Sequence, residues 1–177
     1  FDYLDQRIRA KNRLSAFAFP AGRIPADMTR LLAVAQSARD IPAPLLVMDT
    51  APAAVLGALF DPLTRGMAST GPLILCNIGN FHTIAFRLDP AGIEGVLEHH
   101  TGLIDQPKLE DLLEKLAAGT LTHAEVFADH GHGAAQRFAL RLEQDVRQDR
   151  NRVLAFDDAL EQLEFELSKS LMPTGAL

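Results

Sequence analysis

The chain has 177 residues, of which 47% are hydrophobic and 23% charged, and its formal net charge is −6. These ordinary fractions exclude a disordered, collagen-like or low-complexity chain, and the length suffices for one domain or two small lobes. Its 17 lysines and arginines are spread along an acidic chain, which argues against nucleic acid as a partner because binding needs clustered cations.

The single cysteine, Cys76, excludes an internal disulfide and any zinc or iron–sulfur site held by several cysteines of these residues. It lies in an apolar run, so we expect it to be a small core residue. A reducing, cytoplasmic location is favoured. No apolar run approaches the roughly 20 residues of a membrane-spanning helix, and no signal peptide is recognisable. Because the chain begins at Phe1 rather than Met, we interpret it as a truncated piece of a longer protein.

The first third of the chain carries one clear helical pattern. Residues 1–23 lack a clear period, and no element is predicted there. Apolar residues at helical spacing after Pro25 predict a helix that ends before Pro42. Further along, residues 61–71 are rich in Pro, Gly, Ser and Thr and are predicted to form a loop.

Between these segments the pattern predicts a strand, a tight turn and a helix. Residues 45–48 are a short apolar run, Asp49 and Thr50 follow at once, and residues 51–60 show helical spacing. Thr50 is the expected N-cap of that helix.

Three consecutive strands are predicted next. Residues 73–78, 83–88 and 93–98 are strand-like runs, and a Gly79-Asn80 turn joins the first two. Together they predict a three-stranded antiparallel meander.

The remaining pattern is mainly helical. Leucines at helical spacing predict a helix from Pro107 to Gly119, and a capping-box pattern at Thr122 predicts a short helix after it. A loop is expected over residues 128–135, and helix is expected from about residue 136 to 171.

The hairpin turn after the first of the three strands is the first candidate site. Asn77, Gly79, Asn80 and Thr83 are small and polar, and a turn of such residues can present backbone N–H groups to a phosphate. The alternative is an ordinary hairpin turn without a ligand.

The histidines form the second candidate site, since five of the six fall at predicted strand or loop ends. They occur in three short polar motifs: His82, then Glu98-His99-His100, then Asp129-His130-Gly131-His132. Such residues could coordinate a divalent metal or bind a phosphate through hydrogen bonds. Adjacent side chains on a strand point to opposite faces, so His99 and His100 are expected to separate.

Asp49 is the third candidate. It follows a strand and precedes a helix, where a carboxylate facing a cleft could hold a magnesium-bound water.

The order of these pieces resembles the middle of an actin-like ATPase, the superfamily of actin, heat-shock chaperones and sugar kinases. Asp49, Ala51, Ala53 and Ala54 match the acidic turn and helix that follow a strand there. The second phosphate loop is matched by Asn77, Gly79, Asn80 and Thr83. In that superfamily the loop begins with Asp, whereas Asn77 stands here, which favours binding over hydrolysis.

The strings VMDTA, NIGNFHT, EHHTG and GHGA resemble an uncharacterised prokaryotic family of that superfamily, labelled as a pyruvate formate-lyase activating enzyme. Radical activases need three closely spaced cysteines for their cluster, so that activity is not expected of a chain with one.

The resemblance implies an α/β, ribonuclease-H-like or actin-like lobe with a mixed sheet, in which the antiparallel meander is flanked by helices. Residues 1–60 would be the remnant of a first lobe with its crossing helix, and residues 72–177 the second lobe. The implied function is binding of nucleotide phosphate, with ATP and Mg²⁺ as cofactors and a possibility of ATP hydrolysis or phosphoryl transfer.

In this interpretation Asp49 is the catalytic and magnesium-holding residue. The expected nucleotide-binding residues are Asn77, Gly79, Asn80, His82, Thr83, His99, His100, Asp129, His130, Gly131, His132 and Gly133. Two alternatives remain. One is a non-catalytic module that binds a protein partner, or a second copy, through its C-terminal helices; the other is a metal-dependent hydrolase that uses the histidines.

Overall fold

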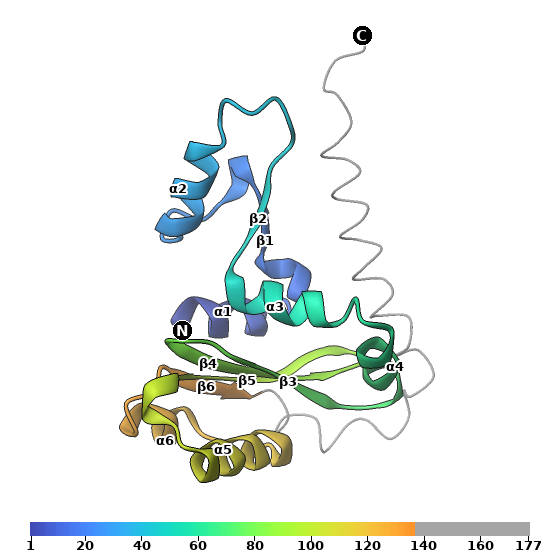
Figure 1. Ribbon diagram of the computed structural model, residues 1–177, viewed down its shortest axis with the longest axis vertical. Helices are drawn as coiled ribbons and strands as arrows, with labels where there is room; N and C mark the ends of the chain where they lie inside the picture. Colours follow the sequence, from blue (N-terminus) through green and yellow to red (C-terminus); the bar gives the residue numbers. More distant parts are fainter. Residues whose placement is uncertain (137–177) are drawn as a thin grey trace.

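The computed structural model describes residues 1–136, and a four-stranded antiparallel sheet lies at its centre (Figure 1). The strands follow the order β3 (Leu73–Ile78), β4 (His82–Asp89), β5 (Gly92–His100) and β6 (Gly133–Gln136). The predicted meander is therefore confirmed as β3-β4-β5. The prediction of a loop over residues 128–135 is wrong from residue 133 on, because pairing with β5 converts four weakly patterned residues into a strand.

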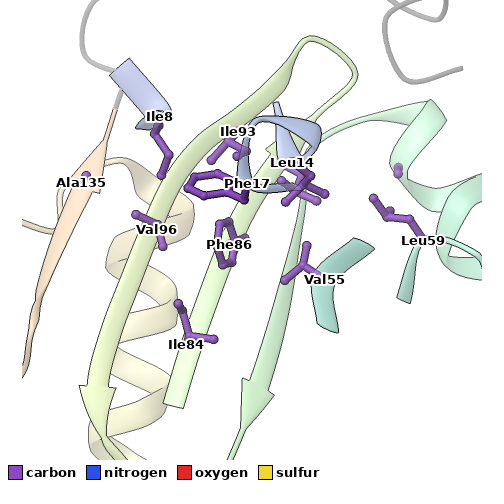
Figure 2. Close-up of a cluster of buried hydrophobic side chains, with 12 residues drawn as sticks. Ile8, Leu14, Phe17, Val55, Leu59, Ile84, Phe86, Ile93, Val96 and Ala135 are labelled. Carbon is purple, nitrogen blue, oxygen red and sulfur yellow. The ribbon is translucent and has the colours of Figure 1, made fainter. Parts of the chain in front are cut away.

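One face of the sheet packs against α1 (Asp2–Ala10), the 3₁₀ turn η1 (Leu14–Phe17) and α3 (Thr50–Ala58). Figure 2 shows this core, to which β4 contributes every second residue, and β5 contributes Ile93 and Val96 on either side of an irregularity in the strand register. The labelled side chains are Ile8, Leu14, Phe17, Val55, Leu59, Ile84, Phe86, Ile93, Val96 and Ala135. We call this side the α1/α3 face.

The other face packs against α5 (Gln106–Ala118) and α6 (His123–Ala128), which lie below the sheet in Figure 1. We call it the α5/α6 face. Its core consists of Ala85, Leu97, Leu112, Leu116, Leu121, Val126 and Ala134. The predicted helix after Pro107 and the capping box at Thr122 are both confirmed. Gly119 ends α5 with φ 74°, a left-handed conformation that suits glycine.

A second, two-stranded sheet pairs β1 (Ala18–Pro20) with β2 (Leu46–Met48), again antiparallel. It lies above the α1/α3 layer in Figure 1, together with η2 (Ala21–Arg23) and the predicted helix α2 (Thr29–Ser37). The α/β class is confirmed. All strand pairs within residues 1–136 are antiparallel, so the expected mixed sheet does not form there.

Two further sequence predictions are wrong. The predicted loop 61–71 contains the helix α4 (Pro62–Thr70), because the Asp61 side chain caps it by accepting the Thr64 N–H at 3.0 Å and Pro62 suits its first turn. Cys76 is exposed rather than buried, because β3 is an edge strand of the sheet and its second half is uncovered.

In the part of the chain that the structure describes, no helix combines the length and apolar character needed to cross a membrane. The helix predicted for residues 136–171 lies outside the described residues beyond its first position. The proposed division at residues 60 and 72 stays a prediction, although residues from both sides of it share the core on the α1/α3 face.

Candidate functional site

A cleft of about 530 Å³ lies on the α1/α3 face, at the end of the sheet where β3 and β4 join. Its walls come from α1, the start of α2, the start of α3, the β3-β4 hairpin and the segment before β6. The polar and charged lining residues include Arg30, Asp49, Thr50, Asn77, Gly79, His82, Glu98 and His132. Aromatic side chains, among them Tyr3 and Phe81, line it as well. Its size and mixed chemistry are those of a small-molecule site.

Asp49 is held in this cleft by a helix cap. Its Oδ1 accepts the Thr50 N–H at 2.8 Å, so Asp49 is the N-cap of α3 and the expectation that Thr50 caps the helix is wrong. Asp49 lies between the last residue of the short strand β2 and the first residue of α3. The capping hydrogen bond fixes its carboxylate at the positive end of the helix dipole.

The hairpin turn is held closed by Thr101. The Gly79 N–H donates to the His82 carbonyl at 3.0 Å, and the Thr101 hydroxyl donates to the Gly79 carbonyl at 2.7 Å. Thr83 is buried, and its hydroxyl lies 3.1 Å from that of Thr101. The hydroxyl groups of Thr83 and Thr101 therefore already have hydrogen-bond partners within the protein. Among residues 1–136, the backbone N–H groups of Asn80 and Phe81 at the tip have no acceptor.

Three histidines meet at one end of the cleft. His82 begins β4 and is paired in register with His100 at the end of β5, while the His132 N–H donates to the Glu98 carbonyl at 3.0 Å. The ring centres lie 5.2 Å apart for His82 and His100, 4.9 Å for His82 and His132, and 4.5 Å for His100 and His132. One ring nitrogen from each lies within 4.8 Å of the others.

An unusual backbone conformation at Gly133 permits this arrangement. Ala134 packs on the α5/α6 face, so strict alternation would direct residue 132 to that face too. Gly133 has φ 141°, which side-chain-bearing residues rarely adopt, and the His132 ring lies instead against His82 and His100.

The His132 side chain is partly buried beside the other two histidine rings. Its Nε2 atom is buried and has no hydrogen-bond partner among the described residues. Burial is the main cause that lowers the pKa of His132; the neighbouring His100 and His82 rings lower it further, and the Glu98 carboxylate opposes them. The neutral imidazole, which has a free lone pair for a ligand, is therefore favoured.

His99 points to the opposite face, as alternation predicts. It is fully buried, with Nε2 3.1 Å from Asp129 Oδ2 and Nδ1 3.2 Å from the His100 carbonyl. Lys108 Nζ lies 2.5 Å from the same Asp129 oxygen. The Lys108 hydrogen bond is the main cause that holds the pKa of Asp129 below its usual range, with His99 contributing. This network joins β5, α5 and the end of α6 beneath the sheet.

Thus the structure brings together part of the predicted site. Asp49, Asn77, Gly79, His82 and His132 line the cleft, and His100 joins the two histidines at its end. Asn80 is exposed at the turn, and His130 is exposed with φ 64°. Gly131 and Gly133 have structural reasons to be glycine, because a Cβ atom would come within 2.5 Å of the His99 ring and within 2.3 Å of the His123 ring, respectively.

Sequence reasoning missed several lining residues. Tyr3 lies in residues 1–23, where the hydrophobic residues show no helical or strand spacing. Arg30 lies on α2, and no other charged residue of that helix lines the cleft. Thr101 was missed as the residue that holds the hairpin. Its position next to a His-His pair at a strand end was the available signal.

Comparison with known proteins gives one match. A model of the family described as "Putative pyruvate format-lyase activating enzyme (DUF1786)" matches residues 1–154. The chain therefore belongs to this family. No curated protein and no solved structure matches it.

Proposed function

We propose that this chain is a lobe of the actin-like type whose cleft binds the phosphate groups of a nucleotide, in the form of ATP with Mg²⁺. One observation carries the proposal. Asp49 belongs to one sequence motif and Asn77, Gly79 and His82 to another, and the residues of both motifs line a single cleft. The order of strand, acidic turn, helix and hairpin supports the actin-like interpretation.

The donor atoms at one wall suit magnesium. Mg²⁺ prefers oxygen ligands and keeps several waters, so a site needs only one or two carboxylates beside the phosphates. The Asp49 carboxylate would supply one, and Asn77 and Thr50, whose side chains carry an amide oxygen and a hydroxyl, line the same cleft. When bound, Mg²⁺ would neutralise phosphate charge.

A phosphate site also needs hydrogen-bond donors for the phosphate oxygens, and three kinds of group could supply them. Arg30 lines the cleft and carries a positive charge, and His82 offers a ring N–H. The N–H groups of Asn80 and Phe81 at the turn have no acceptor among residues 1–136. These groups would orient the phosphates, and the aromatic lining would exclude water beside them.

The family's description names activation of pyruvate formate-lyase. Radical activation would require a cluster held by three cysteines, and the 177 residues contain only Cys76. We therefore do not extend that activity to this chain. The alternative of a partner-binding module depends on helices that lie outside the described residues.

Calorimetric titration of the full chain with ATP, with and without Mg²⁺, tests the proposal. The matched variants are Asp49→Asn and Asp61→Asn, because both aspartates are helix N-caps and only Asp49 lines the cleft. Asparagine retains the capping oxygen and removes the charge. We expect Asp49→Asn to weaken Mg²⁺-dependent ATP binding roughly tenfold, about 1.4 kcal/mol, and Asp61→Asn to leave it unchanged.

Absence of heat from the wild-type chain with ATP and Mg²⁺ would overturn the proposal, and so would equal binding by both variants. Gly79→Val is a poorer test. A Cβ atom there would lie 2.9 Å from the His82 carbonyl oxygen, so the substitution would distort the hairpin itself.

A further inference from the structure

The three clustered histidines have no task in phosphate binding that requires all of them. His82 and His132 line the cleft, and His100 lies behind them. His82 is exposed and the other two are partly buried. In the neutral form, each presents a lone pair to the same small space.

The spacing of the rings fits coordination of one ion. With nitrogen–metal distances of about 2.1 Å and coordination angles between about 90° and 110°, ring centres lie roughly 4.5–5.2 Å apart. The three measured separations are 5.2, 4.9 and 4.5 Å. The alternative is that the three rings simply pack together as aromatic groups, which would not require their nitrogens to converge. In the structure, however, one nitrogen from each ring lies within 4.8 Å of the others.

A second observation concerns one of the same three side chains. The Nε2 atom of His132 is buried and has no hydrogen-bond partner within residues 1–136. A buried polar nitrogen without a partner costs free energy, and a metal ion bound through this atom would satisfy it.

The backbone around the cluster is held firmly. His82 and His100 are register partners, the Thr101 N–H donates to the Phe81 carbonyl at 2.9 Å, and the His132 N–H donates to the Glu98 carbonyl at 3.0 Å. Three chain segments are thus joined by hydrogen bonds at the point where the rings converge. Such a preorganised set loses little entropy on binding an ion.

We propose that His82, His100 and His132 bind one divalent transition-metal ion of the zinc class, with its remaining coordination positions open to the cleft. Imidazole nitrogens suit Zn²⁺, Co²⁺, Ni²⁺ and Cu²⁺ and do not suit Mg²⁺, which prefers oxygen. Three protein ligands leave room for water or a ligand oxygen, as in catalytic rather than structural zinc sites. Glu98 lies on the same wall of the cleft.

This site is distinct from the Mg²⁺ position proposed at Asp49, and its existence does not depend on nucleotide binding. The test therefore uses the metal alone. The full chain, free of a histidine tag and treated with chelator, is titrated with Co²⁺ while the visible d–d absorption is recorded, and with Zn²⁺ by calorimetry.

We expect one ion per chain, displacement of Co²⁺ by Zn²⁺, and no displacement by Mg²⁺. His82→Ala and His132→Ala should each weaken binding at least 100-fold, since loss of a mere supporting group around a metal costs 10–100-fold. His123→Ala is the matched control, because this histidine is exposed on α6 and outside the cluster. It should bind as the wild type does.

His82 is exposed, so its variant keeps the core intact, and a thermal melt of each variant checks this. Binding by His82→Ala with wild-type affinity would overturn the proposal, as would an absence of Zn²⁺ and Co²⁺ binding by the folded wild-type chain. Metal binding without ATP binding would refute only the proposed function; ATP binding without metal binding would refute only this inference.

Discussion

The buried ion pair between Arg87 and Glu94 allows a quantitative test of the fold that supports the cleft. Arg87 Nε lies 2.9 Å from Glu94 Oε2, and the two residues are 7% and 6% exposed. Arg87 also donates from Nη1 to the Leu116 carbonyl at 3.5 Å and to the Ala117 carbonyl. It therefore ties β4 to β5 and to the last turn of α5.

Replacement of Arg87 by Met keeps the aliphatic volume and leaves the Glu94 carboxylate buried without this cation. Unit charges about 4 Å apart attract by ~4 kcal/mol at an effective dielectric of 20. Loss of one partner of a buried pair costs about 3–5 kcal/mol. We expect Arg87→Met to lower the free energy of unfolding by about 4 kcal/mol at pH 7, measured by urea denaturation of the full chain.

The pH dependence of this loss has a definite sign. Burial is the main cause that raises the pKa of Glu94, the Asp89 carboxylate raises it further, and Arg87 lowers it. Removal of Arg87 therefore raises the pKa of Glu94 further. A carboxyl whose pKa is higher in the folded than in the unfolded state gains stability as pH falls through the folded value toward the unfolded value, about 4.3. The difference between variant and wild type should therefore shrink between pH 7 and pH 5.

The double variant Arg87→Met with Glu94→Gln removes the charge from both positions. At pH 7 we expect the double variant to recover part of the free energy of unfolding that Arg87→Met loses. Its difference in free energy of unfolding from the wild type should depend less on pH than that of the single variant. If the single variant lost the same free energy at pH 5 and pH 7, the argument from a buried charge would be refuted.

Three other substitutions test α6 and the segment after it, which pack on the α5/α6 face of the sheet. Gly131→Ala would place a Cβ atom 2.5 Å from the His99 ring, so urea denaturation should show a loss of about 2–3 kcal/mol. Thr122→Ala removes the capping box of α6 and should cost about 1 kcal/mol in the same assay, while Thr122→Ser should cost less. Asp129→Asn removes a carboxylate whose pKa is lowered by Lys108 and His99. Because that stabilisation is present above the unfolded pKa near 3.9 and is lost as pH falls through the lower folded value, the difference from wild type should shrink below about pH 4.

Local patterns were sufficient where one short segment contains the whole signal. β3 begins and ends at the predicted residues, Leu73 and Ile78, because a continuous apolar run meets a Gly-Asn turn. The predicted helix after Pro107 ends at Gly119, because glycine readily adopts a left-handed conformation. Elements that depend on a distant partner were missed. β1 and β6 have three and four residues, and only pairing with β2 and β5 makes them strands.

The same distinction applies to the site. From the sequence alone came the residue types, their grouping into short polar motifs and the separation of His99 from His100 on a strand. Only the tertiary structure decided which residues meet: the register pairs His82 with His100, and φ 141° at Gly133 brings His132 to them. Alternation along a strand is a local rule, whereas strand register and a left-handed backbone position depend on contacts between residues far apart in the chain.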